Sequence, residues 1–332
     1  MIAMQEIETF PLAQAIYESV ILAGGYPQVQ MLSEKFRKSI LKHGNKDQLQ
    51  WVPEIEAHAM DWCDVYINLR GAANPNEFWD VPSENISINQ TALGKISTLR
   101  WQKTRWCVVR VPNAFFAQQA GVDEETMMNM FFDACLLDWK AQSEEWECWA
   151  SKIDNCHQIQ IIGKNTDLSF SIEGRKWVVG DGRINFPDGE IMTSPLENTV
   201  NGNVFFEIPI YYGGRLFENI FLSWKNGELI EVDSSNNREL LKRILFSDQG
   251  ASKIGEFAFG VNPSIKFFCK DIFFDEKIDH TVHIALGRSY PECGGTNQSA
   301  IHWDIVKDLR NDGCVIIDGK AVLEGGKYHF DQ

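Results

Sequence analysis

The chain has 332 residues, a hydrophobic content of 44% and a formal net charge of −15 at neutral pH. Its length and apolar content allow a large core and predict two domains. The acidic balance, with no cluster of Lys or Arg, argues against nucleic acid as a partner. The lack of a long apolar run argues against a membrane-spanning helix.

The cysteines and the N-terminal residues bear on the cellular compartment. The eight cysteines are scattered and form no C-x-x-C pair, which argues against zinc-ribbon and redox motifs. Residues 1–20 lack a basic segment followed by an apolar block, so we expect no secretory signal. We therefore expect reduced thiols and a cytoplasmic protein.

The first half of the chain mixes helical and strand patterns. Apolar residues recur at helical spacing in two stretches, and two short β-branched runs are typical of buried strands. The predicted elements are helices at 5–23 and 122–150 and strands at 64–69 and 106–111. Strands that alternate with helices predict an N-terminal α/β domain, residues 1–155, with a partly parallel sheet.

Beyond residue 155 the pattern changes to short strand-like runs punctuated by Gly, Asn and Asp. One helix is expected at 237–246. The predicted strands are 157–162, 168–172, 176–179, 204–210, 215–223, 228–232, 264–268, 282–286, 315–317 and 321–323. We expect residues 156–332 to form a sheet-rich C-terminal domain, and the whole chain to be of the mixed α+β or α/β class.

Two histidines lie in contexts that suit a metal site. His302-Trp-Asp304 places two ligand-type side chains on the same face of a strand, because side chains alternate along a strand. His283 lies in an apolar run that ends at Gly287. An H-x-D pair is common by chance, so a hydrogen-bonded core histidine is the competing interpretation.

Two glutamates lie among small and apolar residues. Glu190 follows a Pro-Asp-Gly turn, and Glu256 lies in Gly-Glu-Phe-Ala-Phe-Gly. Such carboxylates are expected to be partly buried and then need a partner. That partner is either a metal ion or a basic residue such as Arg183 or Lys277.

Several blocks of the sequence closely resemble a known enzyme family. The blocks are DGRINFPDGEIMTSP (181–195), IGEFAFGVNPSI (254–265), FDEKIDHTVHIALGRSY (274–290) and NQSAIHWDIVKDLR (297–310), with weaker matches at 104–121 and 165–177. In this order they resemble the thermophilic metallo-aminopeptidase family that includes aminopeptidases T and S. The likeness is clear from about residue 101 to the C-terminus and faint before it.

The resemblance implies a pair of divalent ions, Zn, Co or Mn, held by two Glu, two His and one Asp. The matching positions are Glu190, Glu256, His283, His302 and Asp304, and a family tyrosine matches Tyr290. Five protein ligands exceed the three of an ordinary catalytic zinc site and suit two ions that share a carboxylate. The implied protein is a cytoplasmic homodimer that releases N-terminal amino acids from peptides with a free N-terminus, through water activated by the two ions.

Two catalytic roles follow from the resemblance. Glu256 is expected either to act as general base, because apolar surroundings raise the pKa of a carboxyl group, or to bridge the ions. Tyr290 is expected to donate a hydrogen bond to the tetrahedral oxyanion. The competing interpretation of Tyr290 is a strand-end ring with its hydroxyl in solvent. Residues 275–277 are expected to support the ligands or to form a solvated turn.

Two departures from the family pattern leave an alternative function open. The stretch between Tyr290 and His302 is shorter than in typical members, and residues 24–60 match little. A catalytically weak or inactive member that binds metal or peptide is therefore the alternative. A two-metal phosphoesterase is a third hypothesis; it predicts Arg or Lys near the ligands, and Arg288 is the candidate for that role.

Overall fold

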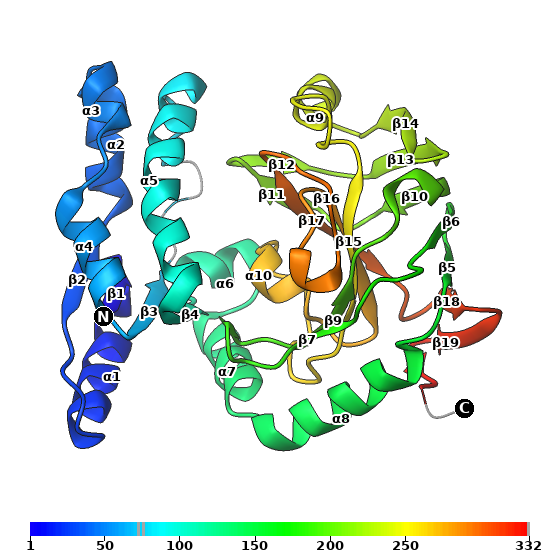
Figure 1. Ribbon diagram of the computed structural model, residues 1–332, viewed down its shortest axis with the longest axis horizontal. Helices are drawn as coiled ribbons and strands as arrows, with labels where there is room; N and C mark the ends of the chain where they lie inside the picture. The colour runs from blue at the N-terminus through cyan, green and yellow to red at the C-terminus, as the bar shows by residue number, and fades with distance from the viewer. Residues whose placement is uncertain (72–73, 75–76, 331–332) are drawn as a thin grey trace. The chain divides into compact units, whose positions relative to one another are not determined.

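The chain forms two compact units in the computed structural model, which describes residues 1–71, 74 and 77–330 (Figure 1). The first unit is Met1–Phe131 with Arg183–Pro187, and the second is Phe132–Gly182 with Asp188–Gln332. The predicted mixed class, with a partly parallel sheet and a sheet-rich second half, is confirmed. The predicted boundary at residue 155 between an N-terminal domain and a catalytic domain stays a prediction.

The first unit is built on a five-stranded sheet in the order β2-β1-β3-β4-β8. Every neighbouring pair in it is parallel. The strands are β1 (Ile2–Gln5), β2 (Val29–Leu32), β3 (Val65–Arg70), β4 (Arg105–Arg110) and β8 (Asn185–Phe186). The helical elements are η1 (Ile7–Thr9), α1 (Phe10–Leu22), α2 (Glu34–His43), α3 (Lys46–Gln50), α4 (Glu54–Trp62), α5 (Ser83–Lys103), α6 (Ala114–Ala120) and α7 (Glu124–Cys135), the last continuing into the second unit.

Side-chain caps set several helix boundaries. Ser33 caps α2, Asn113 caps α6, and Asn45 forms a capping box with Gln48 at α3. The single helix predicted at 122–150 is wrong, because Asp138 begins a second helix by accepting the N–H of Ala141.

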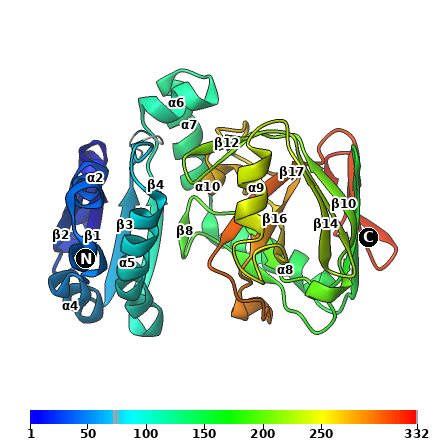
Figure 2. The same ribbon diagram turned by 90° about the horizontal axis from the view of Figure 1, so that it is seen from above.

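The second unit is dominated by antiparallel sheets (Figures 1 and 2). The larger has the order β14-β13-β10-β6-β5-β18-β19-β20 and the smaller β17-β16-β15-β9-β7; β11 and β12 pair separately. The strands are β5 (Gln158–Gly163), β6 (Thr166–Ser171), β7 (Val178–Gly180), β9 (Glu190–Thr193), β10 (Asn201–Phe206), β11 (Ile210–Tyr212), β12 (Arg215–Phe217), β13 (Ile220–Lys225), β14 (Glu228–Asp233), β15 (Ile254–Gly260), β16 (Thr281–Gly287), β17 (His302–Asp308), β18 (Gly313–Ile317), β19 (Lys320–Glu324) and β20 (Lys327–Tyr328). The helical elements are α8 (Trp139–Ile153), η2 (Glu197–Thr199), α9 (Arg238–Leu245), α10 (Ile272–Asp275) and η3 (Pro291–Cys293).

One continuous hydrophobic core joins both large sheets of this unit. It includes Phe170 and Leu222 from the larger sheet, Phe257 and Ile284 from the smaller sheet, and Trp146 from α8. Burial of apolar surface on this scale is the main force that holds the two sheets face to face. The opposite face of the smaller sheet is therefore free to carry polar side chains.

Three predicted strands differ from the structure. The run 204–210 contains the end of β10 and the start of β11, which residues 207–209 separate. Residues 264–268 are not a strand, because the Asn262 side chain accepts the N–H of Ser264 and starts a turn. The run 215–223 is two strands, β12 and β13, separated at Asn219, whose φ is 51°.

Candidate metal centre

The candidate ligands project from one face of the sheet formed by β17, β16, β15 and β9. Glu190 begins β9, Glu256 lies on β15, His283 on β16, and His302 and Asp304 on β17. Alternation sends the residues beside them, such as Phe257, Ile284 and Ile305, into the core. The structure thus brings together all five residues that the sequence singled out.

A β-bulge aims Glu256 at this face. In a regular strand Ile254 and Glu256 would point the same way, but Ile254 is in the core. The pairing with β16 shifts by one residue between them, which leaves Gly255 as the extra residue. A Cβ on Gly255 would lie 2.4 Å from the Gly287 carbonyl oxygen, so only glycine fits there. Glu256 therefore faces the site because of Gly255.

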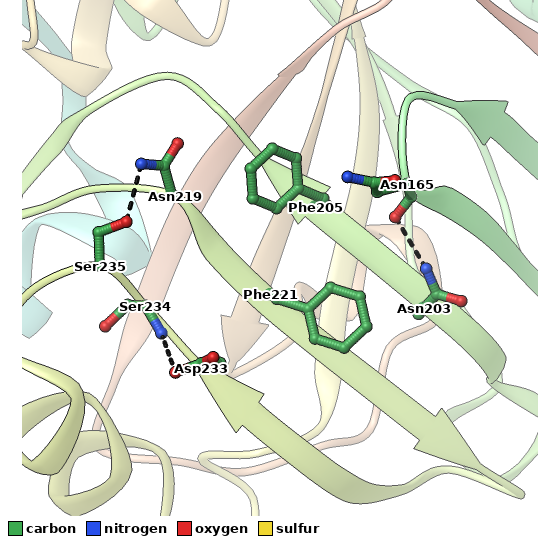
Figure 3. Close-up of a pocket in the computed structure, with 8 residues that line it drawn as sticks. All are labelled: Asn165, Asn203, Phe205, Asn219, Phe221, Asp233, Ser234 and Ser235. Carbon is green, nitrogen blue, oxygen red and sulfur yellow. Dashed lines mark hydrogen bonds between the residues drawn. The ribbon is translucent and has the colours of Figure 1, made fainter.

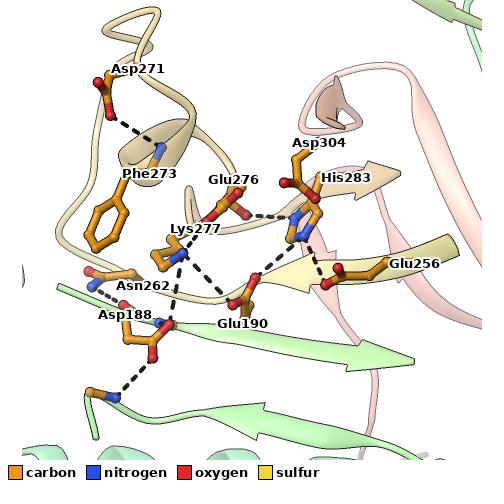
Figure 4. Close-up of polar contacts among 12 residues, drawn as sticks. Asp188, Glu190, Glu256, Asn262, Asp271, Phe273, Glu276, Lys277, His283 and Asp304 are labelled. Carbon is orange, nitrogen blue, oxygen red and sulfur yellow. Dashed lines mark hydrogen bonds and ion pairs between the residues drawn. The ribbon is translucent and has the colours of Figure 1, made fainter. Parts of the chain in front are cut away.

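The five side chains form two groups that share Glu256. Figure 4 shows the first group, Glu190, Glu256 and His283, with Asp304 nearby. In the first group, His283 Nε2 lies 3.4 Å from Glu190 Oε2 and 3.5 Å from Glu256 Oε1. In the second, His302 Nε2 lies 3.2 Å from Glu256 Oε2 and 3.4 Å from Asp304 Oδ1. The two oxygens of Glu256 therefore face different groups, as a bridging carboxylate requires.

Backbone carbonyls orient both imidazole rings. His283 Nδ1 lies 3.0 Å from the carbonyl oxygen of Glu276, and His302 Nδ1 lies 2.7 Å from that of Arg288. When Nδ1 carries the proton and donates it to the carbonyl, the lone pair of Nε2 points toward the carboxylates. This is the usual arrangement around metal-ligating histidines.

The electrostatics show an excess of buried negative charge. Burial raises the pKa of Glu190 to about 8, although the ammonium of Lys277 opposes the rise. Burial opposes a charge on His283, but the hydrogen bond to Glu256 and the Glu190 charge outweigh it and raise the pKa to about 9. For His302 burial is likewise outweighed, mainly by Asp304, and its pKa rises to about 12. These imidazoles hold protons because they lie among carboxylates, which is also where a cation would bind.

The expectation that apolar surroundings raise the pKa of Glu256 is wrong. Burial alone would raise it, but hydrogen bonds from His283 and His302 outweigh burial and lower the pKa. A carboxylate whose pKa is lowered is a weaker proton acceptor. This supports the bridging alternative for Glu256 rather than the general-base alternative.

Three further charged side chains lie beside the ligands and are buried. Lys277 is 0% exposed and forms ion pairs with Glu276, with Glu190 at 3.8 Å and with Asp188 at 3.9 Å. Of the two interpretations of residues 275–277, burial excludes the solvated turn. Asp188 was not singled out from the sequence, since a Pro-Asp-Gly turn is usually solvent-exposed.

Tyr290 lies against one of the ligands. Its ring centre is 4.8 Å from that of His302. Burial, with the charges of Glu256 and Asp304, raises the pKa of Tyr290 well above its usual value. The phenol therefore keeps its proton at neutral pH, and the half-buried side chain lies beside His302.

The donor set suits divalent transition metals. Two His and three carboxylates supply nitrogen and oxygen ligands of the kind that bind Zn, Co and Mn. Among the residues that the structure describes, all groups of His, Cys, Asp and Glu close enough to share an ion lie here, including a third made by Glu276, His283 and Asp304.

A separate hollow of about 620 Å³ lies elsewhere on the second unit (Figure 3). Amides and hydroxyls surround the rings of Phe205 and Phe221 there, and Asp233 is the one carboxylate in its lining. It offers no group of metal ligands.

Fold and site together describe a largely buried, carboxylate-rich candidate metal centre on an antiparallel sheet. The chain belongs to the thermophilic metalloprotease family (M29), whose model matches residues 1–327. The family resemblance expected from the sequence blocks is thereby confirmed, and it extends through the N-terminal residues where the blocks were faint.

Individual proteins with similar sequences are named as aminopeptidases. Aminopeptidase 2 of Geobacillus stearothermophilus is 23% identical, and the match covers 98% of this chain and 92% of that protein. Aminopeptidase T of Thermus thermophilus is 29% identical over 76% of this chain and 72% of its own length.

Two solved structures share the fold. Wild-type AmpT from Thermus thermophilus superposes with a TM-score of 0.85 at 23% identity, covering 98% of this chain and 93% of that one. The 2,5-dihydroxypyridine dioxygenase of Pseudomonas putida KT2440 superposes with a TM-score of 0.63 at 13% identity, covering 99% and 90%. The fold is therefore shared by proteins with different names, and function has to be argued from the site.

Proposed function

We propose that the protein is a metal-dependent aminopeptidase that releases N-terminal amino acids from peptides. The observation that carries the proposal is the pair of three-residue groups that share Glu256. Membership of the metalloprotease family and the names of the relatives support peptides as the substrate class.

Two divalent ions, Zn, Co or Mn, would be held by these groups. Glu190 and His283 would hold one, His302 and Asp304 the other, and Glu256 would bridge them. When bound, such ions lower the pKa of water to near neutrality and polarise a carbonyl group. Glu276, beside His283 and Asp304, would not be needed as a ligand, since its carboxylate is paired with Lys277.

The chain's own residues would contribute in two further ways. The protonated phenol of Tyr290 would donate a hydrogen bond to the oxyanion as the peptide carbonyl becomes tetrahedral. The excess of carboxylates would favour a substrate that brings a positive α-ammonium group, as the free N-terminus of a peptide does. An internal peptide bond brings no such group.

Metal analysis and dipeptide hydrolysis together test this function. The purified protein should hold two ions per chain and should release amino acids from unblocked dipeptides. Chelation should abolish turnover, and Zn²⁺, Co²⁺ or Mn²⁺ should restore it. Equal rates on free and N-acetylated peptides would refute the exopeptidase assignment, and two bound ions without turnover on a broad panel would favour the metal- or peptide-binding alternative.

The resemblance also supports three organisational proposals. We infer a cytoplasmic homodimer, with residues 156–332 as the catalytic domain because all five proposed ligands lie there. Of the helices that the structure describes, none has the length and apolarity to cross a membrane. Light scattering of the purified protein tests the dimer, and a metal ligand found among residues 1–155 would contradict the domain assignment.

A further inference from the structure

Lys277 is a fully buried ammonium group that follows α10. Besides its three carboxylate partners, it lies 5.1 Å from the centre of the Phe273 ring. Burial opposes its charge, but Glu190 and Glu276 outweigh burial and raise its pKa, so the side chain is a cation. A buried cation needs such partners, because an uncompensated charge in the interior is costly.

A second buried lysine of the same unit shows the ordinary arrangement. Lys307 on β17 is 1% exposed and lies 2.7 Å from Glu207 Oε2, with the carbonyl oxygen of Lys164 at 3.3 Å. One cation there meets one carboxylate. Lys277 instead meets three, so its neighbourhood keeps an excess of negative charge that further cations would balance.

The contacts of Lys277 are confined to one side of the candidate metal centre. Glu190 is held between two groups, with Oε1 3.8 Å from the Lys277 ammonium and Oε2 3.4 Å from His283 Nε2. Glu276 also connects the two, since its carboxylate pairs with Lys277 and its carbonyl oxygen meets His283 Nδ1. By contrast, the His302 ring is oriented by the Arg288 carbonyl oxygen, on a separate segment.

We propose that Lys277 is a positioning residue for one of the two ions. It fixes the orientation of Glu190 and, through Glu276, of the His283 ring. These two ligands and Glu256 would hold one ion, and the ion at His302 and Asp304 would depend less on Lys277. The inference rests on the proposed two-ion site and adds an asymmetry to it.

Two opposing effects have to be separated in a test. Removal of the ammonium would lessen its repulsion of a nearby divalent ion, which favours binding, and would release Glu190, which disfavours it. The double variant Lys277→Met/Glu276→Gln removes one positive and one negative charge together. Its net charge is unchanged, and the Glu276 carbonyl oxygen that meets His283 remains. A change in the affinity of this variant for metal ions therefore reports the lost orientation of Glu190 and His283.

The experiment is calorimetric and equilibrium-dialysis titration of the chelator-treated full chain with Co²⁺. Wild type should bind two ions. In the double variant one dissociation constant should rise about 10–100-fold, the usual effect of losing a group that orients a ligand. The other constant should rise clearly less, because the change reaches that position only through the shared Glu256 and through Glu276 beside Asp304. Asp304→Asn impairs the position at His302. When it is added to the double variant, only the weakly bound ion at Glu190 and His283 should remain.

The matched control is Lys307→Met/Glu207→Gln, which removes the ion pair between the buried Lys307 and the half-buried Glu207 on the other face of the same sheet. Both Co²⁺ constants should stay within about 2-fold of wild type. Unchanged constants in the Lys277 variant, or an equal loss at both positions, would overturn the inference. A wild-type protein that binds fewer than two ions would instead refute the two-ion site itself. If circular dichroism shows the double variant unfolded, Lys277→Gln replaces it, and selective weakening of one ion is still required.

Discussion

The two faces of the sheet formed by β9, β15, β16 and β17 use the same strands but depend on different interactions. One face packs Phe257, Ile284 and Trp303 into the core, where apolar burial stabilises the fold whatever the solution conditions. The other presents Glu256 and His283, whose buried charges are balanced only in part by protein groups. The first face makes the scaffold, and the second makes a site whose stability depends on cations and pH.

The largest expected effect is that of Glu256→Gln on the site face. The amide keeps the shape but removes the shared charge, so both ions should be weakened. Since bound ions contribute several kcal/mol to the reaction, kcat/KM should fall at least about 10³-fold. Dipeptide hydrolysis and metal content measure this. The exposed Glu231→Gln is the control, and a Glu256→Gln enzyme that retains two ions and its activity would remove Glu256 from the site.

A core-face substitution should have the opposite profile. Phe259 is 0% exposed and contacts the rings of Trp177 and Phe257. Phe259→Ala should lower the free energy of unfolding by about 3–5 kcal/mol, as loss of a buried ring does. Denaturant unfolding measures the loss. Under conditions where the variant is folded, it should still bind two ions. A Phe259→Ala variant with wild-type stability that had lost its metal would contradict the separate roles of the two faces.

Tyr290→Phe should separate catalysis from metal binding on the site face. Loss of one oxyanion donor should reduce kcat by about 10²–10³, with little change in KM, because the hydrogen bond forms mainly in the transition state. Metal content and unfolding should stay as in wild type. Turnover within a few-fold of wild type would restore the interpretation of Tyr290 as a structural ring, and loss of metal would make it a ligand.

The smallest effect concerns pH and the chelator-treated protein. His283 keeps its proton in the folded state up to about pH 9, whereas an unfolded histidine loses it near 6.5. Between pH 6.5 and 9 the folded state therefore binds more protons, and its stability falls as pH rises.

Thermal unfolding in excess chelator measures this loss, which should reach about 1.4 kcal/mol per pH unit for each retained proton. Co²⁺ affinity should rise over the same range, because the ions compete with these protons. For the same reason, activity should fall as the pH is lowered. Constant or rising stability of the chelator-treated protein from pH 6.5 to 9 would contradict the proton-holding arrangement, and the core-face variant Phe259→Ala should show the same pH slope as wild type.

Much of the site was predictable from the sequence. Alternation along a strand was enough to place His302 and Asp304 on one face. The blocks around Glu190, Glu256 and His283 identified the family, which the match over residues 1–327 confirms. Helix α9 and most short strands of the second half were also predictable, because turn residues and apolar runs are local signals.

The tertiary structure decided the features that depend on distant partners. Strand β1 is stabilised by pairing with β2 and β3, and no local sequence pattern predicts it. The bulge at Gly255 that turns Glu256 to the site is set by pairing with β16. The pKa of Glu256 is lowered by two imidazoles on other strands, against the expectation from its apolar neighbours in sequence. Lys277 and Asp188 read locally as turn residues, and they are buried beside Glu190 because the loops that carry them fold over the same sheet face. Patterns along a chain report local geometry, whereas burial and charge compensation depend on which segments meet in space.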